Sequence, residues 1–354
     1  MKAQVFYKAE KMHFEDRDLP QIGDQEILVK VKACGICGSD IAYYYGRSPL
    51  ETETGEGPLI LGHEFSGEVV QLGNYVKLLN LFKEGDKVVA NPVQCCNSCR
   101  MCIKGNFNLC ENSKVIGVSV DGAFAEYVKI RYTNVIKLPE DISFEEAALI
   151  EPLSCATYAV RNANIDIGDF TVVFGPGSIG LMMIQLIKSI GAGKIVLVGT
   201  RDYPLELGRM LGANFIFNIK DENSKYFTND LLKEINTLTD FNLADRVLVA
   251  TSSIQAAQSA LLISGAKSNI VFFGLGGPED VLKVPMLDTL TGDKRLIFSW
   301  LAPNVWPYSI KALSTGKVKL DKIITHRFPL EKLEEAIIKM SVSKENKMKG
   351  VIVF

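Results

Sequence analysis

Two groups of cysteine, histidine and acidic residues in this chain have the types and spacing of metal ligands. In the first group, Cys37 stands in the run Gly-Ile-Cys-Gly-Ser-Asp, and Glu64 directly follows His63. One thiolate, one imidazole and a nearby carboxylate, with one open position, form the ligand set of a catalytic zinc ion. A lone histidine is more often a packed or surface residue. The glycines beside both candidates favour the metal, because they let the backbone bend around it.

The second group consists of four cysteines with the spacing C-x2-C-x2-C-x7-C, namely Cys96, Cys99, Cys102 and Cys110. Four thiolates in a tetrahedral array suit a closed, structural zinc site. An iron–sulfur cluster is the alternative, because C-x2-C-x2-C also opens ferredoxin motifs. The long gap before Cys110, and the lack of a proline after it, count against that alternative. We expect Cys95 to be a bystander, because only Cys96 keeps the two-residue spacing.

A glycine motif predicts a dinucleotide site. Gly175-x-Gly177-x-x-Gly180 follows an apolar strand expected over 170–174 and opens an amphipathic helix expected over 179–190. Such glycines permit a tight turn and let a pyrophosphate approach the N-terminus of the helix. The residues that we expect to contact the cofactor are Gly175, Pro176, Gly177, Ser178, Ile179, Gly180, Gly199, Thr200, Arg201, Thr251, Phe273, Gly274 and Leu275.

The end of the next strand bears on the choice between NAD and NADP. A carboxylate at this point would bind the ribose 2′-hydroxyl of NAD, but Gly199 stands there. Thr200 and Arg201 instead offer a hydroxyl and a guanidinium to a 2′-phosphate. Two alternatives remain: Arg201 is only a solvated loop residue, or Asp202 reaches a ribose hydroxyl. The pattern favours NADP over NAD.

The hydrophobic pattern changes character along the chain. Up to about residue 150, alternating strands are expected between glycine turns, at 26–33, 67–70 and 85–89. From residue 165 onward, continuous apolar strands alternate with helices, which is typical of a parallel sheet covered on both faces, at 170–174, 194–198, 246–250 and 269–274. A helix over 330–340 and a strand over 350–354 are expected at the end.

The overall composition excludes some classes of protein. The chain has 354 residues and a formal net charge of −2, which gives no field for nucleic acid or an acidic membrane. Five of the eight cysteines lie between 95 and 110, and this clustering favours metal over disulfides. The N-terminus predicts a strand rather than a signal peptide, and the apolar run 181–187 is too short to span a bilayer. We therefore expect a cytoplasmic protein.

Taken together, the chain resembles the zinc-dependent medium-chain dehydrogenases, the superfamily of alcohol, sorbitol and threonine dehydrogenases. The resemblance runs essentially from end to end. It is carried by the cysteines from 96 to 110 and by Cys37-Gly38-Ser39-Asp40, Gly62-His63-Glu64, Gly85-Asp86-Lys87-Val88, Glu151-Pro152-Leu153-Ser154 and Thr325-His326-Arg327-Phe328-Pro329-Leu330.

The resemblance implies an α/β protein in which a Rossmann, doubly wound parallel sheet is inserted in a mostly β, GroES-like catalytic domain. We expect the catalytic domain with its structural zinc lobe over 1–153 and the dinucleotide-binding domain over 154–295. Residues 296–354 are expected to return to the catalytic domain.

The resemblance also implies roles for single residues. Cys37 and His63 correspond to ligands of the catalytic zinc, and Glu151 falls at the third-ligand position, where sorbitol-type enzymes have glutamate. Glu64 corresponds to a second carboxylate that can enter or leave the metal shell. The structural alternatives are that Glu64 only orients the site and that Glu151 binds through water. Cys155 matches a position near the nicotinamide ring, or is simply a small buried side chain.

Ser39 is similar to the hydroxyl that passes the substrate proton onward, although it is also a residue at the start of a helix. Many relatives have a histidine three positions later, where this chain has Ala42. Water, Tyr43 or the cofactor ribose would have to replace it. Trp300 and Trp306 match a segment that lines the substrate cleft in relatives, or are ordinary core.

The sequence thus predicts an oxidoreductase that transfers a hydride between a secondary alcohol, such as a polyol or sugar alcohol, and NAD(P). It is expected to hold one catalytic and one structural zinc ion, and to form a homotetramer or homodimer. An amino-alcohol dehydrogenase of the threonine type is the first alternative. A catalytically silent NADPH-binding protein is the second. A zinc-ribbon protein that binds nucleic acid is the third, but the cysteine segment contains only Arg100 and Lys104 as cations.

Overall fold

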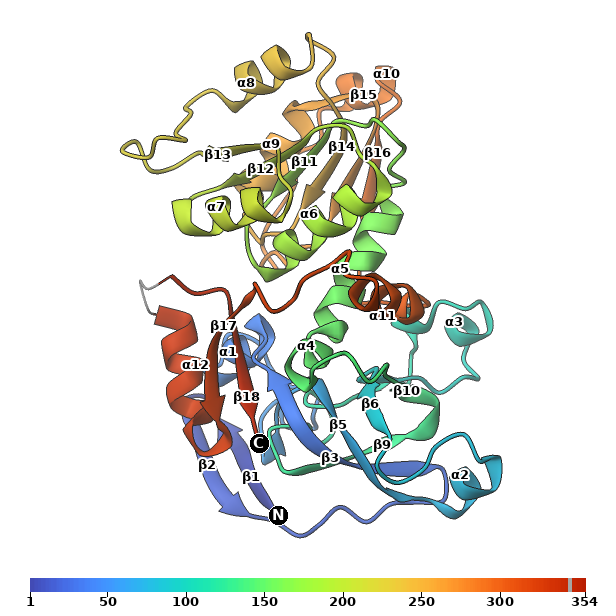
Figure 1. Cartoon of the computed structure of the whole chain (residues 1–354). Coiled ribbons are helices and arrows are strands. Elements are labelled where there is room, and N and C mark those ends of the chain that lie inside the picture. Colours follow the sequence, from blue (N-terminus) through green and yellow to red (C-terminus); the bar gives the residue numbers. More distant parts are fainter. Residues whose placement is uncertain (343–345) are drawn as a thin grey trace. The chain divides into compact units, whose positions relative to one another are not determined.

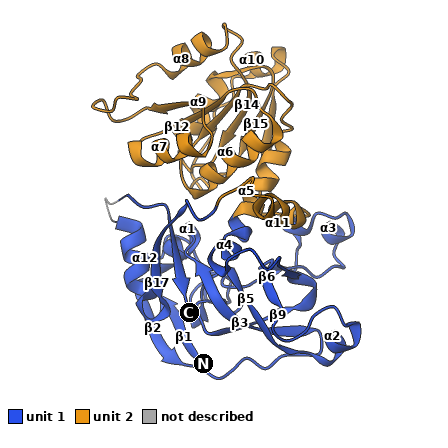
Figure 2. Ribbon diagram, viewed as in Figure 1, with its two compact units in different colours: residues 1–152, 320–354 blue, residues 153–319 orange. Residues whose placement is uncertain are grey.

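The computed structural model describes residues 1–342 and 346–354. Contacts between Cα atoms divide the chain into two compact units, which Figure 2 shows in different colours. Unit 1 contains residues 1–152 and 320–354, and unit 2 contains residues 153–319. The first boundary falls within helix α5 (Ile150–Asn162), which carries Glu151 in its first turn.

Unit 1 is built mainly from antiparallel strands. Its strands are β1 (Lys2–Lys8), β2 (Lys11–Asp16), β3 (Glu26–Gly35), β4 (Leu59–Ile60), β5 (Glu64–Leu72), β6 (Lys87–Ala90), β7 (Val93–Gln94), β8 (Lys114–Val115), β9 (Tyr127–Arg131), β10 (Val135–Lys137), β17 (Ile324–Pro329) and β18 (Lys349–Val353). The largest sheet has the order β10-β6-β5-β3-β18-β17, and β9 also pairs with β3. The helices of this unit are short apart from α12: α1 (Gly38–Tyr44), α2 (Asn74–Leu79), α3 (Arg100–Ile103), α4 (Phe144–Ala148) and α12 (Leu333–Val342).

The centre of this sheet joins segments that are far apart in the sequence. β3 is flanked by β5 and β18, and Gly35 at its end pairs with Glu64 on one side and with Val351 on the other. β3 is buried at nearly every position except Lys30, because strands cover both of its edges and the core lies beneath it. The core of unit 1 includes Phe65 and Phe124, which are almost fully buried. The register therefore places the ends of three distant segments side by side.

Unit 2 contains a six-stranded parallel sheet. Its strands are β11 (Thr171–Phe174), β12 (Ile195–Gly199), β13 (Phe215–Asn218), β14 (Ala244–Val249), β15 (Ser264–Phe272) and β16 (Arg295–Phe298). Their order is β13-β12-β11-β14-β15-β16, the arrangement of a Rossmann sheet with its crossover next to β11. The helices of the unit are α6 (Ser178–Ile190), α7 (Asp202–Leu211), α8 (Leu231–Leu238), α9 (Ile254–Leu262), α10 (Met286–Thr291) and α11 (Trp306–Ser314).

Both faces of the parallel sheet are covered, as the doubly wound class requires. On one face, Val172 and Phe174 of β11 pack with Ala260 of α9 in one apolar cluster. On the other face, α7 packs so closely that a Cβ atom at Gly208 would meet the side chain of Leu197. Figure 1 shows α6 and α7 on the near side of this sheet. The predicted α/β class, with a parallel sheet inserted between two segments of a mostly β unit, is confirmed.

The second unit ends at Lys319, whereas we expected the return to the catalytic domain from residue 296. The predicted domain boundaries at 153 and 295 stay a proposal. Among the described residues, no helix combines the length and the apolar character that crossing a membrane requires.

Candidate metal centres and cofactor pocket

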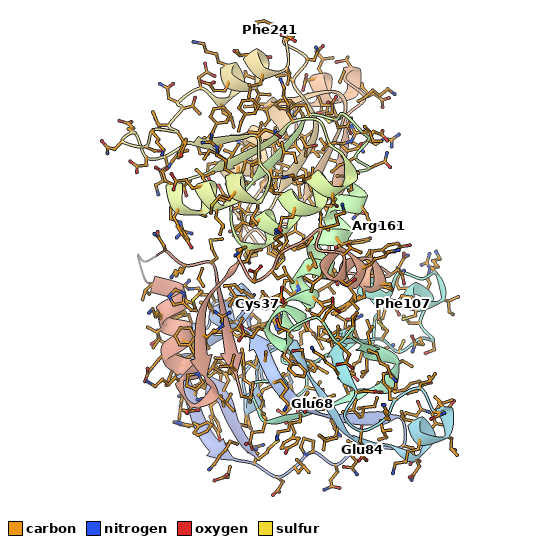
Figure 3. The ribbon with its side chains drawn as sticks, viewed as in Figure 1. Cys37, Glu68, Glu84, Phe107, Arg161 and Phe241 are labelled. Carbon is orange, nitrogen blue, oxygen red and sulfur yellow. The ribbon has the colours of Figure 1, made fainter. Side chains whose placement is uncertain are left out.

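The structure brings Cys37, His63 and Glu64 together in unit 1. One ligand atom from each residue lies within 4.8 Å of the others. Cys37 directly precedes α1, where Figure 3 labels it, and Glu64 is the first residue of β5. The cluster forms because β3 ends beside the start of β5, with Gly35 opposite Glu64. A side chain at Gly35 would collide with the Glu64 carboxylate, so glycine is required at this strand end.

Asp40 lies behind this cluster and is completely buried. Its Oδ2 atom accepts a hydrogen bond of 2.8 Å from the backbone N–H of Cys37, and its Oδ1 atom is 3.7 Å from Nδ1 of His63. Burial raises the pKa of Asp40. Burial alone would lower the pKa of His63, but Asp40, Cys37 and Glu151 together hold it well above its usual range. Because Nδ1 is the nitrogen near Asp40, Nε2 of His63 remains to bind a metal.

Glu64 is paired with a buried lysine. Nζ of Lys349 donates a hydrogen bond of 2.7 Å to Oε1 of Glu64 and lies 2.6 Å from its Oε2 atom. Lys349 is the first residue of β18, two positions before Val351, which pairs with Gly35. Burial alone would lower the pKa of Lys349, but the negative charges of Glu64, Cys37 and Asp40 raise it, so the lysine is charged.

Glu151 is also buried and lies near His63, whose pKa it helps to raise. It is not part of the tight group of three donors, so the structure leaves its predicted ligand role a proposal. Ser39 is half-buried in the first turn of α1. The donor set of one thiolate, one imidazole and carboxylates fits zinc, and the carboxylate behind the imidazole is typical of such a ligand.

The second cluster of donors is the lobe around α3, formed by the four cysteines Cys96, Cys99, Cys102 and Cys110. The sulfur of Cys110 lies 3.6 Å from that of Cys96 and 4.0 Å from that of Cys99. A tetrahedral zinc ion with bonds of about 2.3 Å sets its sulfur ligands roughly 3.8 Å apart. The spacing of these sulfur atoms therefore fits a closed tetrahedral zinc site.

Backbone N–H groups point at the sulfur atoms of the lobe. The N–H of Cys96 donates to Cys110 over 3.3 Å, and the N–H of Cys99 donates to Cys96 over the same distance. Hydrogen bonds from Ser98 and Cys99 lower the pKa of Cys96 to about 5, which favours the thiolate that a metal needs. Cys95 instead donates to the carbonyl of Phe107, the lobe residue labelled in Figure 3, and burial raises its pKa to about 11.

Unit 2 contains a pocket at the carboxyl ends of β11 and β12. Its lining includes seven of the predicted cofactor residues: Gly175, Pro176, Gly177, Gly199, Thr200, Arg201 and Thr251. Gly175 has a φ of +95°, and a Cβ atom there would press against Ala250. The space beside Gly177 is open, and Gly177 caps the N-terminus of α6. A helix N-terminus with open space above it is the arrangement that binds a pyrophosphate.

The remaining predicted cofactor residues do not line this pocket: Ser178, Ile179, Gly180, Phe273, Gly274 and Leu275. Gly180 and Gly274 have a packing role instead, because a Cβ atom at either position would meet a backbone carbonyl, of Gly175 and Thr251 respectively. Cys155 is buried in a small apolar cluster with Ala302 and Val305. Trp306 is buried, and Trp300 is partly exposed.

Comparisons with known proteins agree with this arrangement. Residues 23–140 match the family model described as alcohol dehydrogenase GroES-like domain, and residues 178–315 match the model described as zinc-binding dehydrogenase. The sorbitol dehydrogenase of Bacillus subtilis (strain 168) is 33% identical over 95% of this chain and 92% of its own length. The D-arabitol-phosphate dehydrogenase of Enterococcus avium is also 33% identical, over 96% of this chain and 93% of its own length. The chain belongs to the zinc-dependent medium-chain dehydrogenases.

Solved structures of dehydrogenases have the same fold. A zinc-binding dehydrogenase from Sinorhizobium meliloti 1021, bound to NADP, matches with a TM-score of 0.91 and 25% identity over 100% of this chain and 99% of its own. An alcohol dehydrogenase from E. coli CFT073, complexed with NADH, matches with a TM-score of 0.90 and 27% identity over the same shares. This zinc-dependent dehydrogenase is therefore an enzyme that uses zinc and a nicotinamide cofactor.

Two residues of the dehydrogenase's metal centre were missed by reasoning from the sequence. Asp40 follows Cys37 by three residues, a spacing that places it in the first turn of a helix capped by the ligand, so it could have been found. Lys349 is 285 residues from Glu64, and no local pattern around either residue points to the other.

Proposed function

We propose that this dehydrogenase transfers a hydride between a secondary alcohol, of the polyol or sugar-alcohol class, and NADP. The observation that carries the proposal is the group of the half-buried Cys37, His63 and the buried Glu64, with the buried Glu151 nearby. The names of the sorbitol and D-arabitol-phosphate dehydrogenases among the relatives support a polyol substrate. A zinc ion held by Cys37, His63 and a glutamate would supply Lewis-acid polarisation of the alcohol or ketone oxygen.

The chain's own residues prepare this chemistry. The buried Asp40 carboxylate faces Nδ1 of His63 at 3.7 Å, so its negative charge would favour a proton on Nδ1 and leave Nε2 as the donor for a metal. Ser39 is the hydroxyl that we expect to accept the substrate proton. Tyr43 follows Ser39 by four residues on α1 and therefore lies on the same side of the helix. Burial raises the pKa of Tyr43 to about 12, so it would pass a proton as a neutral hydroxyl, replacing the histidine that Ala42 does not provide.

The cofactor pocket supports NADP. Its described lining contains Thr200 and the exposed Arg201 but no acidic side chain. Asp202, the residue after Arg201, points one carboxylate oxygen at other partners: its Oδ1 atom accepts hydrogen bonds of 2.7 Å from Asn218 and 2.6 Å from Ser224. These contacts tie Asp202 to Asn218 and Ser224, whereas Thr200 and Arg201 offer a hydroxyl and a guanidinium to a 2′-phosphate.

Steady-state kinetics of an Arg201→Ala variant with both cofactors test this preference. A charge-assisted hydrogen bond contributes on the order of 1.5–3 kcal/mol, so the KM for NADP should rise about ten- to a hundredfold while that for NAD stays nearly unchanged. Arg209→Ala is the matched control, because it removes the same charge from the exposed side of α7 outside the pocket. If the unmodified enzyme already prefers NAD, the proposed preference is wrong.

A substitution that shifts the preference from NADP to NAD should be made at Thr200 rather than at Gly199. A Cβ atom at Gly199 would lie 2.5 Å from the ring of Pro176, so an aspartate there would distort the glycine turn itself. Thr200→Glu places a carboxylate beside the same pocket without that collision. It should repel a 2′-phosphate and shift the preference toward NAD.

A substrate screen tests the reaction class. Polyols, simple secondary alcohols and threonine are each assayed with NADP and NAD, and turnover of a polyol above the others is the expected result. Preferential turnover of threonine would support the amino-alcohol alternative. No turnover of any alcohol, with cofactor still bound, would support the catalytically silent alternative.

We also propose that the enzyme is a homo-oligomer, a dimer or tetramer. β16 ends the parallel sheet, pairing only with β15 among the described strands, and Phe298 at its end is 72% exposed. Leu287 and Leu290 of the preceding helix are also strongly exposed. An open strand edge beside apolar side chains favours association with a second copy. Light scattering of Phe298→Lys should show smaller particles than the unmodified chain, with Met210→Lys as the control.

The cytoplasmic location stays a prediction.

A further inference from the structure

Lys349 is a charged residue in an almost fully buried position. It is 5% exposed, and Glu64, its partner, is 1% exposed. Removing both charges from water costs more than such a pair usually returns in stability, and well-packed apolar residues commonly replace buried pairs without loss. The pair is therefore poorly explained as a stabilising contact, and its place beside Cys37 and His63 suggests a role in the metal centre.

The geometry shows what Lys349 does to Glu64. The ammonium lies 2.7 Å from Oε1 and 2.6 Å from Oε2, so both oxygens face the same cation. Gly35 closes another side of the carboxylate, since any side chain there would collide with it. A carboxylate whose negative charge is drawn toward an ammonium at both oxygens is a weaker ligand, because it donates less electron density to a metal.

We propose that Lys349 is a positioning residue that keeps Glu64 near the metal but outside its coordination shell, so that Glu64 does not become a permanent ligand. The inference rests on the proposed function, since it takes Cys37 and His63 as metal ligands. Without Lys349, Glu64 would be a buried, unpaired anion 4.8 Å or less from the other donors, and coordination would be its available partner. The lysine thus keeps a coordination position open for substrate.

Metal binding in a Lys349→Met variant tests the proposal without turnover. Zinc should be held about tenfold more tightly at the Cys37–His63 centre, a change within the range that partners of metal ligands produce. The visible absorption of the cobalt-substituted protein should also change, because an added ligand alters the coordination number. Lys349→Arg, which keeps the cation, should restore the zinc affinity and the cobalt spectrum of the unmodified enzyme.

A second buried lysine provides the matched control. Nζ of Lys294, whose side chain is 5% exposed, lies 2.6 Å from Asp288 and donates to the carbonyl of Ser264 in unit 2. Lys294→Met removes a lysine of the same side-chain burial away from the metal centre and should leave metal binding unchanged. If Lys349→Met behaves like this control, with the same zinc affinity and cobalt spectrum as the unmodified protein, the proposal is overturned.

A double variant covers the case in which Lys349→Met does not fold. Lys349→Met combined with Glu64→Gln removes both charges of the pair, which buried pairs tolerate better than the loss of one. If Lys349 acts through Glu64, the zinc affinity of the double variant should equal that of Glu64→Gln alone. A further change of tenfold between these two variants would show that Lys349 acts on the metal by another route, against the proposal.

Failure of the proposed function gives a different result. In that case the unmodified chain would hold no metal that Cys37→Ala removes, and no alcohol would be oxidised. The Lys349 comparison fails on its own when the unmodified chain binds that metal and oxidises an alcohol while Lys349→Met leaves the zinc affinity and the cobalt spectrum as they were.

Discussion

The two clusters of metal donors in this dehydrogenase are assembled in opposite ways. The lobe takes all four cysteines from one short segment, 96–110, which turns back on itself at Gly105 with a φ of +77°. The proposed catalytic centre takes Cys37, His63 and Glu64 from beside the ends of β3, β5 and α1, and Lys349 joins it from β18. The lobe cluster depends on the fold of one loop, whereas the other cluster depends on how the strands of a sheet pair.

The surroundings of the donors differ in the same way. Backbone N–H groups point at the sulfur atoms of the lobe, whereas Asp40 and Lys349 place full charges beside His63 and Glu64. A closed four-thiolate site adds its binding free energy to folding. A centre positioned by a sheet has its donors in place without the metal. Its charged neighbours can therefore tune metal exchange and the reaction of the substrate. Removing a donor from each centre should therefore have different consequences.

The largest expected effect is that of Cys37→Ala on turnover. The variant should lose activity by at least about a thousandfold, since polarisation by the metal is worth several kcal/mol. Its melting temperature and the zinc content of the lobe should stay close to those of the unmodified enzyme. Activity assays, metal analysis and thermal unfolding measure the three quantities. Near-normal activity would show that Cys37 is not a catalytic ligand.

Cys99→Ala should have the complementary effect. Loss of one thiolate opens the closed site, so the lobe should lose its zinc and the melting temperature should fall by on the order of 5 °C or more. The activity per correctly folded molecule, measured below that temperature, should change much less than in Cys37→Ala. Equal losses of activity in the two variants would contradict the division between a structural and a catalytic centre.

Asp40→Asn should produce a smaller effect, confined to the catalytic centre. The amide keeps the size of the side chain but removes the charge that faces Nδ1 of His63. Zinc affinity at this centre should fall about ten- to a hundredfold, with the lobe zinc unchanged. Competition with a chelator measures both sites in one experiment. An unchanged affinity would mean that the 3.7 Å approach has no role in orienting His63.

The smallest expected effect is a difference in the pH dependence of two neighbouring thiols, Cys95 and Cys96, in the lobe of the metal-free protein. Backbone hydrogen bonds lower the pKa of Cys96 to about 5, whereas burial raises that of Cys95 to about 11. The thiolate of Cys96 should be present above pH 5 and be lost as the pH falls through that value. At pH 7, iodoacetamide should therefore label Cys96 and leave Cys95 unreacted, as peptide mass spectrometry would detect. Similar labelling of the two neighbours would contradict this assignment.

The features that the sequence predicted best are those encoded by local spacing. The glycine turn around Gly175, the apolar strands and the helix expected over 179–190 follow from patterns within about 20 residues, and the structure has that helix at Ser178–Ile190. The lobe is equally local, since four cysteines within one loop can reach one ion. The helix α5, which carries Glu151, was not predicted; Pro152 is tolerated there because it lies in the first turn.

The contacts that were missed depend on strand register. Lys349 reaches Glu64 only because β18 pairs with β3 at Val351 and Gly35, and β3 pairs with β5 at Gly35 and Glu64. A shift of one residue in either pairing would turn the side chains to the opposite face. Neither alternation nor residue type specifies such a register between segments nearly 300 residues apart.

The position of β18 in the sheet has a consequence for the order of synthesis. β18 lies between β3 and β17 in the largest sheet of unit 1, yet it is made after all of unit 2. On the ribosome, the parallel sheet of unit 2 is complete while β3 still lacks its neighbour and Glu64 still lacks its lysine. The parallel sheet of unit 2 can therefore fold first, and the proposed catalytic centre is complete only after β18 has been made.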